Sequence, residues 1–292
     1  MFRTAIGFCL ILLAGCGTTA GVAEFKIYTQ SINAVAEAST PIVDRLSVVE
    51  RANAVDLIDR DGVKVNGATA GLPVRGLAQD FKVEHAAYFA ETGRPPFAGS
   101  VDLSIAALQR FNAALAIYAD GKALDAARSD LLAVATNAQL AAAALKIPLK
   151  GAVPVIEAAS EGAAILGAIG SRAAFRRLLK SEGKKVDDLL VGLIKNAPII
   201  FQYLSAPEFD ERALEVPGTD GFTKATEKVR NTRTLVAEWV LLLQTARQAL
   251  AASLAAVDQP GTAGTGIADA ALISAEIKTR LERIRAILAK KS

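Results

Sequence analysis

The sequence predicts an all-α protein, an elongated bundle of long antiparallel helices. Of its 292 residues 52% are hydrophobic and only 5% aromatic, and 58 are alanine, the residue with the highest helix propensity. A strand-built fold would contain more β-branched and aromatic residues, and a disordered chain would be less hydrophobic. No Pro/Gly/Ser-rich linker divides the chain, so a single helical domain is expected over residues 22–292.

The first fifteen residues have the organisation of an export signal. Arg3 gives a short positive start, and Ala5–Leu13 is an uninterrupted apolar run of nine residues. A membrane-spanning helix needs about 20 apolar residues, so this run is too short to span a bilayer. Residues 1–15 are therefore expected to be a signal peptide, and residues 16–21 a short tether before the first helix.

The end of this signal carries a lipidation motif. Leu13-Ala14-Gly15-Cys16 resembles the lipobox of bacterial lipoproteins. The resemblance implies that Cys16 becomes the new N-terminus and receives two or three acyl chains, which make a stable membrane anchor. Gly17 and Thr18 in such lipoproteins imply transfer to the outer membrane, with the chain facing the periplasm. The alternative is a conventional cleavage site at which Cys16 is an ordinary small residue.

The first helix is expected to begin at Val22. Apolar residues recur from Val22 to Ile58 mostly at spacings of three, four or seven, the pattern of an amphipathic helix. Pro41 is expected to kink this helix or to split it in two, with Ser39-Thr40 capping the second part.

From Asp59 to Ser100 the periodicity lapses and turn signals predominate. Val63-Lys64-Val65 followed by Asn66-Gly67 predicts a small β-hairpin, and a short helix is expected within Ala78–Glu91. Ser100 has the position of an N-cap for a helix that runs from Val101 to about Leu145.

The second half of the chain predicts further helices. Asp120-Gly121 indicates a bend or break in the preceding helix, and Gly151–Ala174 is the most apolar stretch of the mature chain. A helix over Lys185–Leu204, interrupted at Asn196-Ala197-Pro198, is then expected to lead into a loop over Ala206–Gly221.

The last two helices are expected over Thr223–Val257 and about Ile267–Lys290, separated by Gln259-Pro260-Gly261. The second of them carries a coiled-coil-like seam, which could pack within its own bundle or against another chain. The seam consists of Ile273, Ile277, Leu281, Ile284 and Leu288.

The sequence does not favour a catalytic or a metal site. His85 is the only histidine, and acidic neighbours at Asp80, Glu84 and Glu91 give it a conceivable acid/base role. No metalloprotease or serine-nucleophile motif accompanies it, so an ordinary surface histidine and a non-enzymatic protein are expected. The Asp-rich run before Gly62 fits no register of a calcium loop. No metal and no cofactor are expected, apart from the covalent lipid on Cys16. The formal charge of +3 does not indicate a nucleic-acid partner.

The apolar segment Gly151–Ala174 has two interpretations, insertion into a membrane and burial inside the bundle. Ile165, Leu166 and Ile169 could enter a membrane while Arg172 and Arg176 meet anionic headgroups. An exported helical bundle with one apolar segment resembles, in outline only, the α-helical pore-forming toxins of the ClyA type. Burial of this segment inside the bundle is the favoured reading.

The leading hypothesis is an outer-membrane-anchored helical lipoprotein that acts as a scaffold or binding partner in cell-envelope assembly. Its expected partners are the membrane, through the lipid, and a second protein or another copy of itself. The loops Gly62–Ser100 and Ala206–Gly221 are expected to mediate binding because rigid helices would present them. The aromatic candidates in these loops are Phe81, Tyr88, Phe97 and Phe209. The alternatives are a membrane-active or pore-forming protein that uses residues 151–170, and a carrier of a small apolar ligand.

Overall fold

The computed structural model describes residues 21–66, 85–90, 92–120, 171–258 and 263–289. In this part of the chain every regular element is a helix, which confirms the predicted all-α class. The helices are α2 (Val22–Asn66), α4 (Ala86–Phe89), α5 (Pro96–Ala119), α8 (Ser171–Leu214), α9 (Asp220–Asp258) and α10 (Ala263–Ala289). Cys16, Phe81, Ile165, Leu166 and Ile169 lie outside the described residues.

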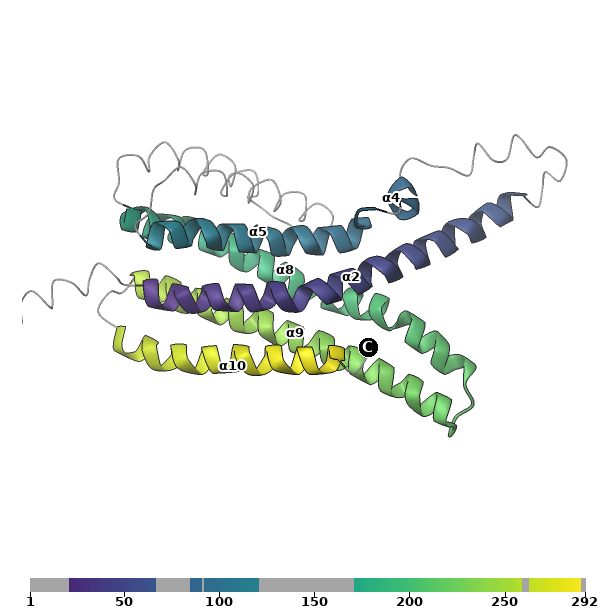
Figure 1. The fold of residues 1–292 in the computed structure, drawn as a ribbon. Helices are drawn as coiled ribbons and strands as arrows, with labels where there is room; N and C mark the ends of the chain where they lie inside the picture. Colours follow the sequence, from purple (N-terminus) through teal and green to yellow (C-terminus); the bar gives the residue numbers. More distant parts are fainter. Residues whose placement is uncertain (1–20, 67–84, 91, 121–170, 259–262, 290–292) are drawn as a thin grey trace, which may run out of the picture.

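The long helices pack side by side, some antiparallel and some parallel to one another (Figure 1). Helix α2 is antiparallel to α5, because Thr29 approaches Asn112 near the start of α2 while Glu50 contacts Phe97 further along. The α8–α9 pair is antiparallel as well, with ion pairs from Lys180–Asp258 at one end to Lys228–Glu211 at the other. Helix α10 runs alongside α2 in the same direction, joined to it at Gln30–Ser274 and Glu37–Arg285.

The core lies between α2, α5, α8, α9 and α10, and all five contribute buried apolar side chains to it. Trp239 of α9 is fully buried, and its indole Nε1 donates a hydrogen bond of 2.8 Å to Ser39 Oγ of α2. Phe25 of α2 meets Phe175 of α8 edge to face, with ring centroids 5.1 Å apart. These contacts follow the three-to-four spacing of apolar residues that the sequence displays.

Helix α2 continues through Pro41 to Asn66, so of the two alternatives expected at Pro41 the split is wrong and the kink stays a prediction. The predicted hairpin is wrong as well. Ser39 and Thr40 do not cap a new helix: their hydroxyls donate to the carbonyls of Val35 and Ala36, one turn back in the same helix. Proline removes one backbone hydrogen bond, and here the packing of α2 against its neighbours outweighs that loss. Residues 63–65 are helical, and α2 bends along its length (Figure 1).

Helix α5 begins at Pro96, four residues before the predicted N-cap at Ser100. Proline suits the first helical position because its missing N–H would have no partner there. Ser100 instead lies inside the helix, where its hydroxyl donates to Pro96 O. The helix ends at Ala119, at the predicted Asp120-Gly121 break, and the predicted continuation to Leu145 lies outside the described residues.

Helix α8 is unbroken from Ser171 to Leu214, so the predicted interruption at residues 196–198 is wrong. The Asn196 amide donates to Gly192 O, and the helix also continues through Pro207. The predicted loop over Ala206–Gly221 is therefore mostly helical, and only residues 215–219 connect α8 to α9. Contacts from Glu208 to Arg45 and Thr232 hold the last part of α8 against its neighbours.

The predicted helices over Thr223–Val257 and Ile267–Lys290 correspond to α9 and α10. The seam of α10 packs within its own bundle: Ile284 is fully buried and Ile277 is 6% exposed. Arg280 and Arg283 flank the seam and both reach Glu238 of α9. The choice between intramolecular and intermolecular packing, left open by the sequence, is thus resolved for these buried seam residues.

Candidate functional site: a groove between α2, α4 and α8

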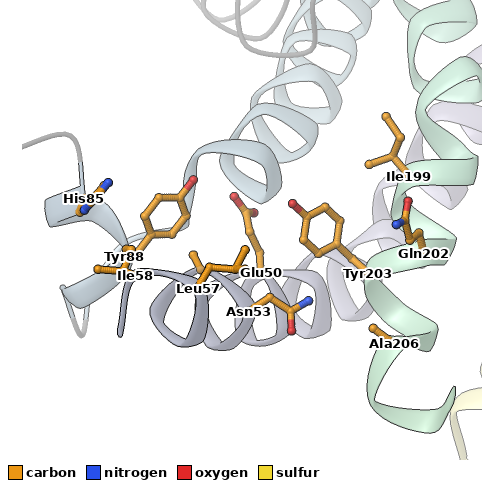
Figure 2. A pocket seen from close by; sticks show the side chains of 11 residues that line it. Glu50, Asn53, Leu57, Ile58, His85, Tyr88, Ile199, Gln202, Tyr203 and Ala206 are labelled. Atoms are coloured by element: carbon orange, nitrogen blue, oxygen red, sulfur yellow. The ribbon is translucent and has the colours of Figure 1, made fainter. Parts of the chain in front are cut away.

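A groove of about 620 Å³ lies between the second half of α2, the short helix α4 and the middle of α8 (Figure 2). Three elements far apart in sequence meet there because α5 turns back along α2 and places Phe97 against α8. It is lined by Glu50, Asn53, Ala54, Leu57, Ile58, His85, Tyr88, Ile199, Gln202, Tyr203 and Ala206. The lining combines apolar side chains with a few hydrogen-bonding groups, the usual composition of a binding site.

Glu50 forms the base of the groove and holds α5 in place. Its carboxylate accepts hydrogen bonds from the backbone N–H groups of Phe97, at 2.9 Å, and Ala98, at 2.8 Å. These two N–H groups belong to the first turn of α5, where no partner exists within the helix. Because Pro95 offers no side-chain cap, a carboxylate from α2 serves as the cap of α5.

The carboxylate of Glu50 is buried, with only 3% of the residue exposed. Burial raises its pKa above the usual value of a glutamate, because desolvation penalises the charged form. The two N–H groups of α5 and the charge of Arg51 oppose this rise in pKa. The groove therefore has a buried carboxyl group at its base, whose charged form is stabilised by the two N–H groups at the start of α5.

Two tyrosines flank this carboxylate. Figure 2 shows Glu50 between Tyr88 of the α4 segment and Tyr203 of α8, with both hydroxyls turned toward it. Burial and the negative charge of Glu50 raise the pKa of both phenols, so both remain protonated donors at neutral pH. Tyr203 is fixed on its other side by stacking on Phe97, with ring centroids 5.7 Å apart.

Exposed apolar side chains form the rim of the groove. Leu57 of α2 is 59% exposed and Ile199 of α8 is 43% exposed, and both line the groove. Large apolar side chains that gather at a concave surface commonly mark an interaction site. The groove can thus accept an apolar group and hydrogen-bond a polar one beside it.

The structure brings some of the predicted binding residues together. Tyr88 lines the groove, and Phe97 supports it through Tyr203. Phe209 is apart from them: it lies within helix α8, not in a loop, and the guanidinium of Arg212 stacks on its ring at 4.8 Å. The expectation that both predicted loops would present aromatic residues is therefore wrong for the second loop.

His85, the candidate acid/base residue, is on the edge of this groove. His85 lines the outer end of the groove, beyond Tyr88 and away from Glu50 (Figure 2). Its acidic neighbours Asp80, Glu84 and Glu91 lie outside the described residues. Within the described ranges, no group of three His, Cys, Asp or Glu side chains is placed to hold a metal ion.

Sequence reasoning missed Glu50 and Tyr203, which form the centre of the groove. Both lie in helical segments whose apolar neighbours indicate a role in the core and not in binding. A signal existed for Glu50, since it follows Leu46 by four residues and so occupies a core position of the helix. A glutamate at such a position requires hydrogen-bond partners, here the first turn of α5.

Comparison with known proteins yields no relative. No family model, curated protein or solved structure matches this chain. The function must therefore be argued from the chain's own residues.

Proposed function

We propose that this chain is an outer-membrane-anchored periplasmic lipoprotein that binds a protein partner in cell-envelope assembly. The anchor rests on the Leu13–Cys16 motif and the export signal before it. The binding role rests on one structural observation, the groove between α2, α4 and α8 with exposed apolar side chains at its rim. The long helices around it supply a rigid frame, as a scaffold protein requires.

The groove favours a polypeptide segment with an apolar side chain beside a hydrogen-bonding group. Leu57 and Ile199 offer apolar surface from two opposite helices, while the hydroxyls of Tyr88 and Tyr203 offer polar contacts between them. Apolar contact supplies most of the affinity of such complexes, and the polar groups fix the orientation.

The partner is tested by purification of the lipidated protein from native envelopes in mild detergent. The variant Leu57→Asp should lose the co-purifying partner, since it places a charge on the apolar rim. Val48→Asp is the matched control: Val48 is 66% exposed on the same helix, nine residues earlier, which places it on the opposite face. Equal capture by Leu57→Asp and wild type would refute the groove as the binding site.

The anchor is tested separately by the intact mass of the purified protein. Acylation at Cys16 predicts a mature chain that begins at this residue and carries two or three acyl chains. The variant Cys16→Ser should lack this mass increment and leave the membrane fraction. A wild-type chain without acyl chains would refute the anchor.

A membrane-active function is the second candidate. Two helices, Arg172–Leu214 and Asp220–Asp258, are long and apolar enough to cross a membrane, and 50% and 44% of their apolar windows are buried in the bundle. Buried helices of soluble proteins pass the same test. The predicted inserting segment 151–170 lies outside the described residues. Leakage from vesicles that disappears in the Ile165→Asp/Leu166→Asp variant would favour this function over the scaffold.

The intact mass of the purified assembly separates the remaining alternatives. A stoichiometric second protein supports the scaffold, and a closed homo-oligomer supports a pore. A monomer that binds an apolar probe in the groove, with saturation, supports the carrier of a small apolar ligand.

A further inference from the structure

Three arginines of α8 gather at the end of the bundle where the described chain begins. Phe175 of α8 packs on Phe25 of α2, so the first turns of these two helices lie level with one another. Arg172 precedes Phe175 by about one turn, and Arg176 and Arg177 follow it directly. We call Arg172, Arg176 and Arg177 the basic collar.

The basic collar has charge available for an external partner. Arg172 and Arg177 are exposed and Arg176 is half-buried, and no hydrogen bond or ion pair joins them to another described residue. The neighbouring Lys180, by contrast, forms an ion pair with Asp258 at 2.5 Å.

The other charged groups at this end do not neutralise the collar. Lys26 of α2 is exposed and adds a further positive charge. Of the described acidic groups, Asp258 is bound to Lys180, Glu24 is 6% exposed, and Asp120, at the end of α5, is not free either. Counted over described residues, five basic groups (Lys26, Arg172, Arg176, Arg177 and Lys180) stand against these three acids.

The position of the collar relative to the proposed anchor identifies its partner. Gly21 packs against Val257 at the same end of the bundle, and Cys16 precedes it by five residues. Five extended residues span less than about 20 Å, so acyl chains on Cys16 would hold this end close to the headgroups. Anionic lipids attract basic side chains near a membrane surface.

We propose that the basic collar binds an anionic phospholipid surface and thereby seats the bundle end-on upon the membrane. This inference rests on the proposed anchor at Cys16, which brings the collar to the surface. The acyl chains alone would leave the bundle free to tilt about its tether, and the collar supplies a second point of attachment. Guanidinium groups suit this contact because they pair with phosphate oxygens through two parallel hydrogen bonds.

The test uses the mature chain, residues 16–292, with Cys16→Ser, so that acyl chains do not mask the contact. Its sedimentation is measured with vesicles of phosphatidylcholine alone and of phosphatidylcholine with 30% phosphatidylglycerol. Binding is expected with the anionic vesicles alone, and 0.5 M NaCl should abolish it because salt screens exposed charges. Equal binding to both kinds of vesicle would overturn the proposal.

The collar itself is tested by reversing its charges. The triple variant Arg172→Glu/Arg176→Glu/Arg177→Glu should bind anionic vesicles on the order of a hundredfold more weakly, at about fivefold for each basic side chain. If circular dichroism shows that it fails to fold, the milder pair Arg172→Gln/Arg177→Gln replaces it, with a decrease of more than tenfold expected. A folded variant that binds like wild type would overturn the proposal.

The matched control reverses three exposed basic residues elsewhere on α8 and α9. Lys195→Glu/Lys224→Glu/Arg230→Glu changes the net charge by the same amount at positions distant from the collar. Binding of this control should stay within twofold of wild type, and an equal decrease would show that net charge alone, not the collar, drives the contact.

The outcomes for the collar and for the anchor are distinguishable. The vesicle assay contains no acyl chains, so its failure removes the collar and leaves the mass measurement at Cys16 untouched. Conversely, an unacylated wild-type chain from cells removes the anchor whatever the vesicles show.

Discussion

Replacing Glu50 by alanine should reduce the free energy of unfolding by about 2 kcal/mol at pH 7. The carboxylate accepts the backbone N–H groups of Phe97 and Ala98, and Ala98 is fully buried, so its N–H would find no water in exchange. An unsatisfied buried N–H costs about 1–3 kcal/mol. A negative charge at a partly buried helix start contributes up to about 2 kcal/mol more. Relief of the buried charge, seen in the raised pKa of Glu50, offsets part of this loss.

Urea denaturation followed by circular dichroism measures this change through the shift in midpoint. Glu227→Ala is the control, since Glu227 is an exposed glutamate of α9 and should leave the midpoint unchanged. The partner-capture assay should also fail for Glu50→Ala, because the start of α5 positions Phe97 and through it Tyr203. A Glu50→Ala midpoint indistinguishable from that of the control would refute the capping role.

Three further predictions concern the buried contacts. Trp239→Phe removes the hydrogen bond to Ser39 and should cost about 1 kcal/mol in urea denaturation, and Ser39→Ala should then cost less in that variant than in wild type. Because burial raises the pKa of Glu50 above 4.5, the native state binds this proton more tightly than the unfolded state does. The free energy of unfolding of wild type, relative to that of Glu50→Gln, should therefore fall as pH rises from 4 to 7. A difference that stays constant over this range would contradict the raised pKa. Ile284→Ala, at a fully buried position of α10, should lower the free energy of unfolding by about 2–4 kcal/mol. Leu272→Ala, at a position 71% exposed, should change it little. Equal decreases would mean that the seam is not packed as described.

The helices could be predicted from the sequence because burial imposes a period on each of them. Residues such as Leu46, Trp239 and Ile284 recur at helical spacing and are all buried in the structure. The ends of the helices are harder to predict: a proline in the sequence indicates a kink or a break at residue 41 and a break at residue 198, yet both helices continue through these positions. The effect of a proline depends on whether neighbouring helices hold the chain on both sides of it, and this information is tertiary.

The groove residues, too, divide into those that the sequence predicts and those that depend on how the helices pack. Tyr88 could be proposed as a binding residue because it lies among turn signals, where side chains tend to be exposed. Tyr203 could not, since its place in the groove depends on α5 bringing Phe97 against α8. Which helices become neighbours is set by the whole bundle, and a single sequence read along its length does not contain that pairing.

The continuity of α2 across Pro41 sets the distance between the start of the helix and the groove. Glu50 follows Val22 by 28 residues in one helix, so at 1.5 Å per residue the groove stands about 42 Å along the helix from its start. With acyl chains at Cys16, a partner that lies flat on the lipid could not reach the groove, whereas one that projects a segment to this height could. Insertion of seven residues into α2 would raise the groove by about 10 Å. Under the proposed function, the length of α2 therefore sets the distance between the membrane and a bound partner.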